Sequence, residues 1–558
     1  MAKMTALCYN FLLITAICVI KEVKCAGEPH IIIIIADDLG WNDVSYHGSS
    51  QIMTPNIDCL AYNGIILNSH YVQPSGSATR AALLTGKYPI KLGMQGESIK
   101  PGVPVGLPDG KILPEYLKDI GYATHFVGKW NLGQSRWNDT PTHRGFDHHF
   151  GFFNGWTSYY DYLTTVTVNG KEYTGFDLRR DTQPAWDLSG QYATDIFTTY
   201  ATDTIQQHDV ARPLFMVISH LAAHAANPSK SLEAPQESID KFGHIIDSGR
   251  RTYAGMVSKI DDSVGAIVSS LEQKGIFDNT VILFISDGGA ASVGEIGNRN
   301  FGSNYPFKGI KGSLWEGGVR SVAFISSQLF LQRGRVSTDL IHVTDWLPTI
   351  LSAANSEVNL FDLDIDGVDL WSSLNYNFDT TRRSTLINID EKNRNAALIL
   401  SSFKLIVGST LNGSYDDYFG ESGEENLQPI SYNSSAVFNS LVGQTITKLS
   451  YQPTNEFEYE SLRNLATIKC EGSDGKHPCD LSDGGICLFN LAKDPCEQDN
   501  MINMLPSLVR QMKRKIVEYR EGLIEQFEMI PNIEESDPKK FQYAWNPWKE
   551  CVDALCTA

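Results

Sequence analysis

The chain has 558 residues, of which 42% are hydrophobic and 10% aromatic, a composition typical of a folded globular protein. This length predicts about two domains. The formal net charge of −19 disfavours nucleic acids and anionic membrane surfaces as partners, because both would repel an acidic chain. A local basic pocket for an anion is not excluded, since exposed charges beyond about 8 Å are screened at physiological salt.

The first 26 residues have the features of a secretory signal peptide. Lys3 precedes an apolar run at 11–20, and we expect cleavage near Cys25 or Ala26. A membrane anchor is the less favoured alternative, because the run is shorter than the roughly 20 residues of a transmembrane helix. No other segment is a candidate transmembrane span. We therefore expect the protein to enter the secretory pathway and to be extracellular or lysosomal. Glycosylation sequons that fit this expectation begin at Asn138, Asn412 and Asn433.

Ten cysteines are present, and two of them, Cys8 and Cys18, lie in the predicted signal peptide. A group near the C-terminus comprises Cys470, Cys479, Cys487, Cys496, Cys551 and Cys556. In an oxidising compartment this even number predicts up to three disulfides, whose pairing the sequence leaves open. A zinc site is the competing interpretation, but paired C-x-x-C spacings are lacking. We expect Cys59 to be an isolated buried thiol unless it pairs with a distant cysteine.

Three apolar runs in the first half, at 31–35, 213–218 and 281–285, lack polar alternation. This pattern is typical of strands buried on both faces of a parallel sheet. Between the second and third runs, apolar residues at helical spacing are Val257, Ile260, Val264, Ile267 and Leu271. The order strand, helix, strand predicts an α/β domain over 27–375. We expect a large doubly wound, mixed or parallel sheet with helices on both faces.

Beyond about residue 375 the sequence changes character. Short strands are predicted at 385–389 and 398–400, an acidic loop at 413–425 and a helix at 505–526. We therefore expect a smaller α+β domain over 376–558, with a short antiparallel sheet and stapling disulfides. The boundary is expected near 371–383. The sequence contains no internal repeat and no nucleic-acid-binding module.

Two of the predicted strands run directly into acidic residues. Asp37 and Asp38 follow the first run, and Asp287 follows the third. Ligands of open α/β sheets bind beyond the carboxyl ends of the strands. Three carboxylates that converge there need a cation to offset their repulsion, and oxygen ligands suit Ca²⁺ or Mg²⁺. The alternative is that these residues cap helices or turns.

Several stretches together carry a family resemblance. They are 36–44 (ADDLGWNDV), 85–89 (TGKYP), 127–133 (VGKWNLG), 144–147 (RGFD), 253–257 (YAGMV), 311–320 (KGSLWEGGVR) and 345–349 (DWLPT). In this order they resemble the sulfatases of the alkaline phosphatase superfamily, most closely the arylsulfatase B-like branch. The resemblance implies that Asp37, Asp38 and Asp287 are ligands of Ca²⁺.

The resemblance also implies roles around the sulfate group. Arg80 matches the arginine that steadies the formylglycine nucleophile, and Lys129 and Lys311 match the lysines that hold sulfate oxygens. Such contacts are useful because negative charge develops on those oxygens in the transition state. His224 matches the histidine that protonates the leaving oxygen; its alternative is an ordinary core or surface histidine.

The chain departs from the family pattern at the positions that matter most. Gly76 stands where the family has the cysteine that is oxidised to formylglycine, and Ala78 and Thr79 replace the proline and serine of the modification signal. No formylglycine is therefore expected. Asn131 replaces a histidine that contacts the formylglycine. Gly288 replaces an asparagine ligand of calcium, so we expect any Ca²⁺ site to be weakened.

These departures favour a secreted pseudoenzyme that lacks the nucleophile. Its remaining cations would either hold a sulfated glycan or aryl sulfate-like anion, or pair with the three carboxylates and close the pocket. One alternative is an active arylsulfatase-type sulfuric ester hydrolase, similar to an N-acetylgalactosamine-4-sulfatase, or a phospho- or sulfohydrolase that uses Ser77 or Ser75. Another is a non-catalytic secreted storage or structural glycoprotein.

Overall fold

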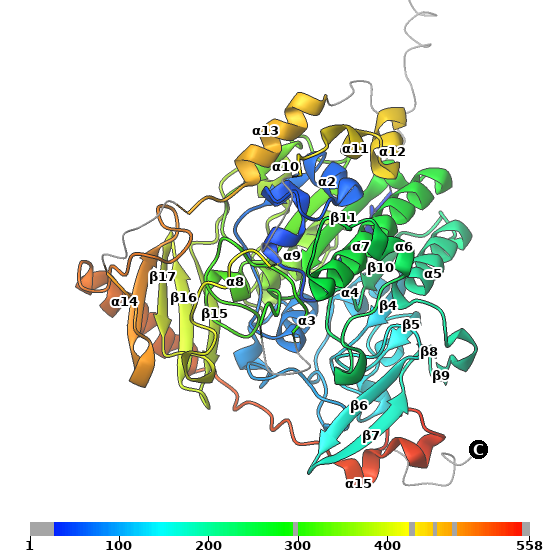
Figure 1. The fold of residues 1–558 in the computed structure, drawn as a ribbon, viewed down its shortest axis with the longest axis horizontal. Helices are drawn as coiled ribbons and strands as arrows, with labels where there is room; N and C mark the ends of the chain where they lie inside the picture. Colours follow the sequence, from blue (N-terminus) through cyan, green and yellow to red (C-terminus); the bar gives the residue numbers. More distant parts are fainter. Residues whose placement is uncertain (1–26, 294–298, 423–429, 450–454, 471–476, 550–558) are drawn as a thin grey trace, which may run out of the picture.

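The computed structural model describes residues 27–293, 299–422, 430–449, 455–470 and 477–549 (Figure 1). A ten-stranded mixed sheet forms the larger part. Its strands, in order across the sheet, are β13 (Arg335–Ser337), β2 (Ile65–Leu67), β12 (Ala323–Ser327), β11 (Thr280–Ser286), β1 (His30–Ala36), β10 (Leu214–Ser219), β4 (Ala123–Lys129), β5 (His148–Phe152), β8 (Arg179–Arg180) and β9 (Gln183–Pro184). The predicted signal peptide, with Cys8 and Cys18, lies outside the described residues.

The centre of the large sheet is parallel and buried on both faces. Strand β1 pairs in parallel with both β10 and β11, and β4 pairs in parallel with β10 and β5. Alternate isoleucines of β1 enter different hydrophobic cores, Ile32 and Ile34 in one and Ile31, Ile33 and Ile35 in the other. The unbroken apolar run is thus explained, because each strand face meets its own layer of helices.

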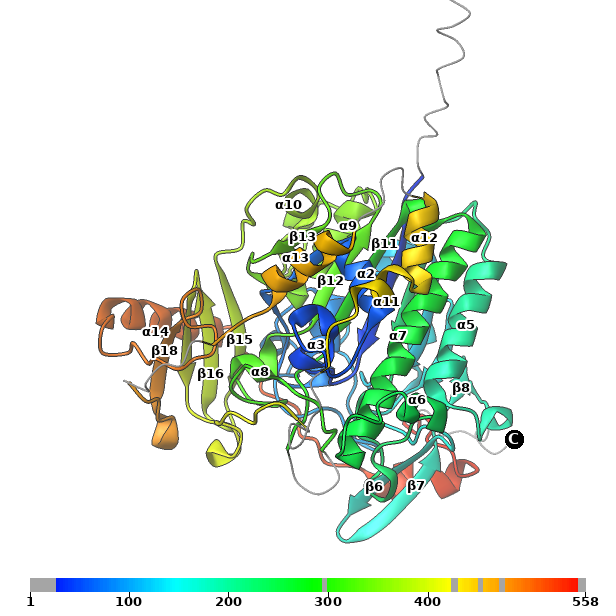
Figure 2. The same cartoon turned by 45° about the horizontal axis from the view of Figure 1, so that its top comes forward.

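Helices cover both faces of this sheet, as the sequence predicts. One core receives side chains from α2 (Pro55–Tyr62), α5 (Ala193–Gln207), α7 (Ser248–Lys274) and α12 (Leu441–Leu449), and the last three lie side by side in Figure 2. The other core receives side chains from α3 (Gly76–Thr85), α4 (Leu113–Asp119) and α9 (Trp346–Ala353). The doubly wound α/β architecture is confirmed, with antiparallel pairing of β12 making the sheet mixed.

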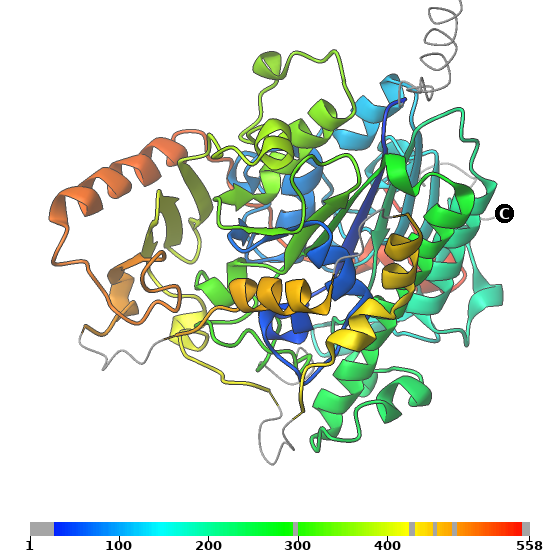
Figure 3. The same ribbon diagram turned by 90° about the horizontal axis from the view of Figure 1, so that it is seen from above.

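A second, four-stranded antiparallel sheet lies at one end of the molecule (Figure 3). It consists of β15 (Ser384–Asp390), β16 (Asn395–Leu400), β17 (Phe403–Val407) and β18 (Ile486–Asn490), and α14 (Pro506–Arg520) packs against it. The predicted short antiparallel sheet is therefore present. Disulfides join Cys470 to Cys496 and Cys479 to Cys487. Cys59 is a free, buried thiol, whereas Cys551 and Cys556 lie outside the described residues.

Segments from the second half of the chain also pack back onto the large sheet. Helices α11 (Ser434–Phe438), α12 and α13 (Glu456–Ala466) contact α2, α7 or the turn at residues 45–47. The remaining elements are β3 (His70–Tyr71), β6 (Leu163–Val168), β7 (Lys171–Phe176), α6 (Gln236–Asp240), α8 (Glu316–Val319), β14 (Ile341–His342), α10 (Trp371–Tyr376) and α15 (Ile533–Ser536). None of the helices in the described part of the chain has both the length and the apolar character that a bilayer span requires.

A buried histidine between the sheet and α7 makes the stability of the fold sensitive to acid. The His220 side chain is fully buried with its Nε2 3.1 Å from Ser263 Oγ, and burial lowers its pKa to about 4. The unfolded chain protonates this histidine below about pH 6.5. The contribution of neutral His220 to stability is therefore fully present above that pH and is lost as the pH falls toward 4.

We expect the free energy of unfolding of the wild type, relative to that of His220→Gln, to fall by up to about 3 kcal/mol between pH 7 and pH 4. Urea unfolding at a series of pH values measures this difference. The exposed His143 supplies the matched control, His143→Gln. A wild-type-minus-variant difference that stays constant over this range would contradict the prediction.

Candidate functional site

The carboxyl ends of four parallel strands meet at one edge of the large sheet. The register pairs Ala36 of β1 with Ser286 of β11, so Asp37 and Asp287 follow neighbouring strands at the same level. Lys129 is the last residue of β4, and His224 lies in the loop after β10. Strand pairing therefore brings residues from distant parts of the sequence together at this edge, as expected for residues at the carboxyl ends of neighbouring parallel strands.

Two cations of this edge are bound to two of the carboxylates. The Arg80 Nε donates to Asp287 Oδ2 at 3.0 Å, and its Nη2 lies 2.9 Å from the same oxygen. Lys129 Nζ donates to Asp37 Oδ2 at 2.5 Å. Ser219, the last residue of β10, adds a further contact, because its Oγ accepts from Arg80 Nη1 at 2.5 Å. Ser219 was not predicted as a site residue. Its signal in the sequence is that a polar residue ends a buried apolar strand.

The third carboxylate is also paired. Lys311 Nζ donates to Asp38 Oδ2, and His224 Nε2 lies 3.6 Å from the same oxygen. Side chains of Lys311 and His224 are 25% and 16% exposed, whereas the side chains of the other two cations are 3% exposed. Lys311 and His224 therefore form the outer surface of a cluster that is otherwise closed to solvent. We refer to Asp37, Asp38, Asp287, Arg80, Lys129 and Lys311 as the ion cluster.

Burial controls the protonation of this region. It raises the pKa of Asp38 to about 7, although Lys311 opposes the shift. Burial also acts to lower the Lys311 pKa, but the carboxylates of Asp38, Asp37 and Asp287 together outweigh it and the pKa is raised. The His224 pKa lies well below its usual value, because the ring is buried and Lys311 and Lys129 are close. His224 is therefore neutral at physiological pH, and because its Nδ1 donates to Ala225 O, its Nε2 carries no proton for a leaving group.

Oxygen atoms in the ion cluster partly suit a metal ion. Ligand atoms of Asp37, Asp38 and His224 lie within 4.8 Å of one another, which makes this acidic group a candidate metal site. The Oδ1 atoms of Asp37 and Asp38 are buried and accept no hydrogen bond from any described residue. Ca²⁺ prefers six to eight oxygen ligands. Only these two of the six carboxylate oxygens are free, because all three Oδ2 atoms contact cations and Asp287 Oδ1 accepts from Asp38 N at 3.2 Å.

The charges of the ion cluster also disfavour a calcium site. Three carboxylates face three cations, so the ion cluster is neutral without a metal. A Cβ built on Gly288 would lie 3.6 Å from Asp38 Oδ1, so a side chain at this position would point at one of the free oxygens. Glycine supplies no such ligand. The residues present therefore do not complete a calcium site.

Gly76 is the first residue of α3 and faces the ion cluster. A Cβ built on it would lie 2.9 Å from Asp287 Oδ2, closer than such contacts occur. The position of the expected nucleophile is thus at the centre of the site, and in this chain it carries no reactive group. A longer side chain at position 76 would collide with the Asp287–Arg80 pair.

Asn131 and Ser77 form a bracket beside Gly76. Ser77 Oγ lies 3.0 Å from Asn131 Oδ1 and accepts from Ile99 N at 3.0 Å, while Asn131 Nδ2 donates to Ile99 O at 3.0 Å. Asn131 has φ +53°, a left-handed conformation that asparagine tolerates better than most residues. The partners of Ser77 Oγ among the described residues are Asn131 and the Ile99 backbone, and neither is a base that could activate it as a nucleophile.

Ser75 does not fill that role either. Its Oγ donates to Gly96 O at 2.9 Å, away from the carboxylates. It lines a cavity of about 180 Å³ between the start of α3 and the small sheet. Neutral polar side chains that line this cavity include Gln95, Asn388, Asn393 and Asn395. The cavity adjoins the ion cluster through Gly312, the residue after Lys311.

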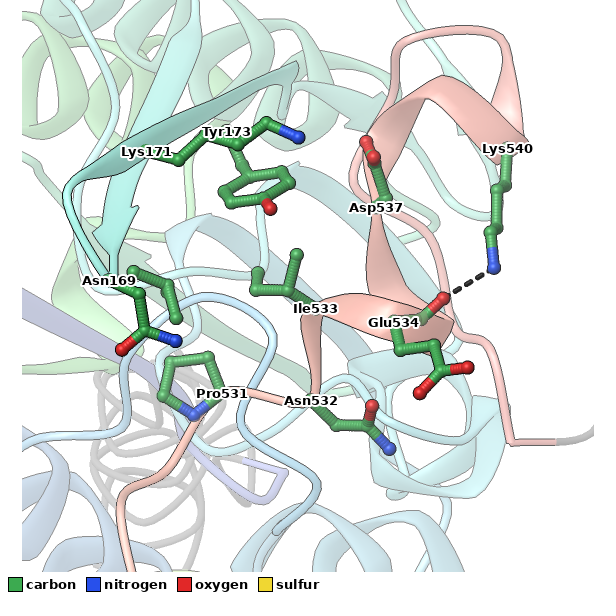
Figure 4. Close-up of a pocket in the computed structure, with 10 residues that line it drawn as sticks. Asn169, Lys171, Tyr173, Pro531, Asn532, Ile533, Glu534, Asp537 and Lys540 are labelled. Carbon is green, nitrogen blue, oxygen red and sulfur yellow. Dashed lines mark hydrogen bonds between the residues drawn. The ribbon is translucent and has the colours of Figure 1, made fainter.

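A larger surface groove lies elsewhere, between β7 and α15 (Figure 4). It has a volume of about 590 Å³ and is lined by Tyr173, Pro531 and Ile533 among others. Lys540 Nζ donates to the backbone oxygen of Glu534 at one side of it. None of the predicted site residues lines this groove.

Comparison with known proteins assigns the fold and the residues at the strand ends to one protein family. The Sulfatase family model matches residues 29–356. Arylsulfatase J of Mus musculus is 32% identical over 550 residues, which cover 94% of this chain and 82% of that protein. N-acetylgalactosamine-6-sulfatase of Mus musculus is 34% identical over 360 residues, or 61% of this chain and 65% of that enzyme.

Solved structures show the same likeness. The crystal structure of Ps i-CgsB in complex with k-i-k-neocarrahexaose has a TM-score of 0.68 and 25% identity, and the match covers 92% of this chain and 97% of that one. The chain therefore belongs to the sulfatase family.

Proposed function

We propose that this chain is a sulfatase-family protein of the secretory pathway that does not hydrolyse sulfate esters. The observation that carries the proposal is Gly76, which supplies no nucleophile at the centre of the site. Extracellular or lysosomal residence follows from the predicted signal peptide and the sequons.

The pairing in the ion cluster supports the proposal. In a working sulfatase site Lys129 and Lys311 would be directed at sulfate oxygens, yet here each amine contacts an aspartate. A sulfate group would have to compete with a carboxylate for each lysine, and in a buried site the separated charges would be costly. We further propose that Ca²⁺ binds weakly, because Gly76 and Gly288 contribute no ligand.

A gain-of-function variant tests which positions account for the loss. It combines Gly76→Cys, Ala78→Pro and Thr79→Ser with Asn131→His and Gly288→Asn, and is expressed in cells that convert the cysteine to formylglycine. We expect this variant to hydrolyse an aryl sulfate in the presence of Ca²⁺, because it regains the nucleophile and two of its partners.

The matched control is the same variant with alanine in place of cysteine at 76, which we expect to be inactive. Mass spectrometry establishes whether formylglycine has formed. A repaired protein that carries formylglycine, binds Ca²⁺ and still shows no turnover would contradict the assignment of the loss to these five positions.

Retained binding of a sulfated saccharide is a second candidate function. The observation that favours it is the partial exposure of Lys311 and His224 next to the amide-lined cavity. Amide groups suit sugar hydroxyls, and a lysine suits a sulfate. The related enzyme is named for N-acetylgalactosamine sulfate, which makes that sugar the natural probe.

We expect N-acetylgalactosamine 6-sulfate to bind weakly and saturably in calorimetry, and Lys311→Met to abolish the binding, because none of the described residues that line the adjoining cavity is a lysine or arginine. Unsulfated N-acetylgalactosamine is the control ligand. Absence of saturable binding would favour the third candidate, a secreted storage or structural glycoprotein without a ligand.

A further inference from the structure

Four histidines gather at the edge of the large sheet opposite the ion cluster. His30 begins β1, His148 begins β5, His125 lies near the start of β4, and His208 follows the last residue of α5. The last three line one cavity of about 490 Å³. They come from separate segments of the sequence, and no short motif connects them.

The spacing of the rings fits shared coordination of one ion. His125 and His148 are direct partners in the β4–β5 register, and their ring centres are 5.2 Å apart. Zinc–imidazole bonds of about 2.0–2.1 Å at a tetrahedral angle place two ring centres about 5 Å apart. His208 faces the same cavity, and its ring is packed edge-on against His30 with centres 5.6 Å apart.

The hydrogen bonds leave one nitrogen of each cavity histidine available. His208 Nε2 lies 2.8 Å from Arg212 O and donates to it, so its Nδ1 keeps a lone pair. His148 Nδ1 lies 3.6 Å from Asp181 Oδ2, which leaves Nε2 free. His125 Nδ1 is buried without a partner among the described residues. A carbonyl or carboxylate on the second ring nitrogen is the usual support of a metal-binding histidine.

His30 is not a ligand in this arrangement. Its Nδ1 accepts from Leu214 N at 3.0 Å, so in the neutral ring Nε2 carries the proton. Its contribution is to hold the ring of His208 in place.

Charge around the cavity is compatible with a cation. The carboxylates of Asp203 and Asp209 line the cavity and offer oxygen ligands.

One cation shares the cavity wall, but it is held elsewhere. The Arg212 guanidinium donates to Gly121 O at 3.2 Å and to Tyr122 O at 3.0 Å. Its guanidinium is thus fixed by backbone carbonyls and does not depend on the histidines for a partner.

We propose that His125, His148 and His208 form a binding site for a divalent transition-metal ion that prefers imidazole ligands, with Zn²⁺ as the probe. Among the described residues only the acidic group of Asp37, Asp38 and His224 has three ligand atoms within 4.8 Å of one another, so the three cavity histidines must turn their rings inward to share an ion. The His148 side chain is 55% exposed and therefore has room to turn its Nε2 into the cavity.

Calorimetry on untagged protein at pH 7.5 tests the proposal, with ZnCl₂ as titrant. We expect one saturable site, and His148→Gln to weaken its affinity on the order of 100-fold. Because His148 is exposed, this variant is expected to fold, and circular dichroism checks that it does. His208→Gln is the second variant and is expected to weaken Zn²⁺ binding to a similar extent.

Two control substitutions locate the ion. His143→Gln removes an exposed histidine outside the cavity, and His224→Gln removes the histidine of the acidic group; both are expected to leave the affinity unchanged. Absence of saturable Zn²⁺ binding would overturn the proposal. So would binding that survives both His148→Gln and His208→Gln, or binding that is lost in His224→Gln.

Discussion

Replacing Lys129 with methionine is expected to lower the free energy of unfolding by about 3–5 kcal/mol, because it leaves a buried carboxylate without its cation. Lys129 and Asp37 have side chains 3% and 1% exposed. After the substitution the nearest cation to Asp37 Oδ2 among the described pairs is Arg80, whose Nη2 lies 4.0 Å away and already contacts Asp287. Urea unfolding at pH 7 measures the loss.

A double substitution separates charge pairing from packing. Lys129→Met combined with Asp37→Asn removes both charges, and we expect it to be clearly more stable than Lys129→Met alone. Lys87→Met is the surface control, because Lys87 pairs with an aspartate that is 81% exposed, and we expect a change within about 0.5 kcal/mol. A loss below about 1 kcal/mol for Lys129→Met would show that the ion cluster does not stabilise the fold as described.

The second large effect is expected at a buried triad between the two sheets. Lys404 of β17 places its Nζ 2.8 Å from Glu316 Oε1 and 2.9 Å from Glu497 Oε1, and all three side chains are fully buried. Glu316 begins α8, so the lysine connects β17 of the small sheet to this helix. Burial raises the Glu497 pKa to about 7, with Lys404 opposing the shift.

We expect Lys404→Met to lower the free energy of unfolding by about 3–5 kcal/mol, because among the described ion pairs Glu316 then keeps only Arg320, at 3.2 Å, and Glu497 keeps none. The loss is measured by urea unfolding. Lys404→Met with Glu497→Gln removes one of the carboxylates and is expected to recover part of it. Equal stability of the wild type and Lys404→Met would contradict this interpretation of the triad.

Much of the fold was predictable because its signals are local. The isoleucine run at 31–35 has no polar position, and only a strand covered on both faces accommodates such a run. The aspartates that follow two such strands predicted a shared edge, and the register of Ala36 with Ser286 places them there. Gly76 and Gly288 are informative in the sequence because their neighbours carry the family pattern.

Other features depend on contacts that no local pattern encodes. The sequence left open whether Lys129 and Lys311 hold an anion or pair with carboxylates, because either outcome uses the same residues. The pairing of Cys470 with Cys496, the bracket between Ser77 and Asn131, and the return of α11–α13 to the large sheet all join distant segments. The histidine cavity is the clearest example, since it assembles from β4, β5, α5 and the loop after α5, which are separate segments of the sequence.

Because Gly76 occupies the nucleophile position, we expect the protein to perform no sulfate ester hydrolysis. The most direct test is an assay of purified, secreted wild-type protein with an aryl sulfate and an aryl phosphate, at pH 5 and pH 7, with Ca²⁺ present. We predict rates equal to those of the buffer alone for both substrates. Saturable turnover that co-purifies with the protein and disappears in Ser77→Ala or Lys311→Met would contradict the account.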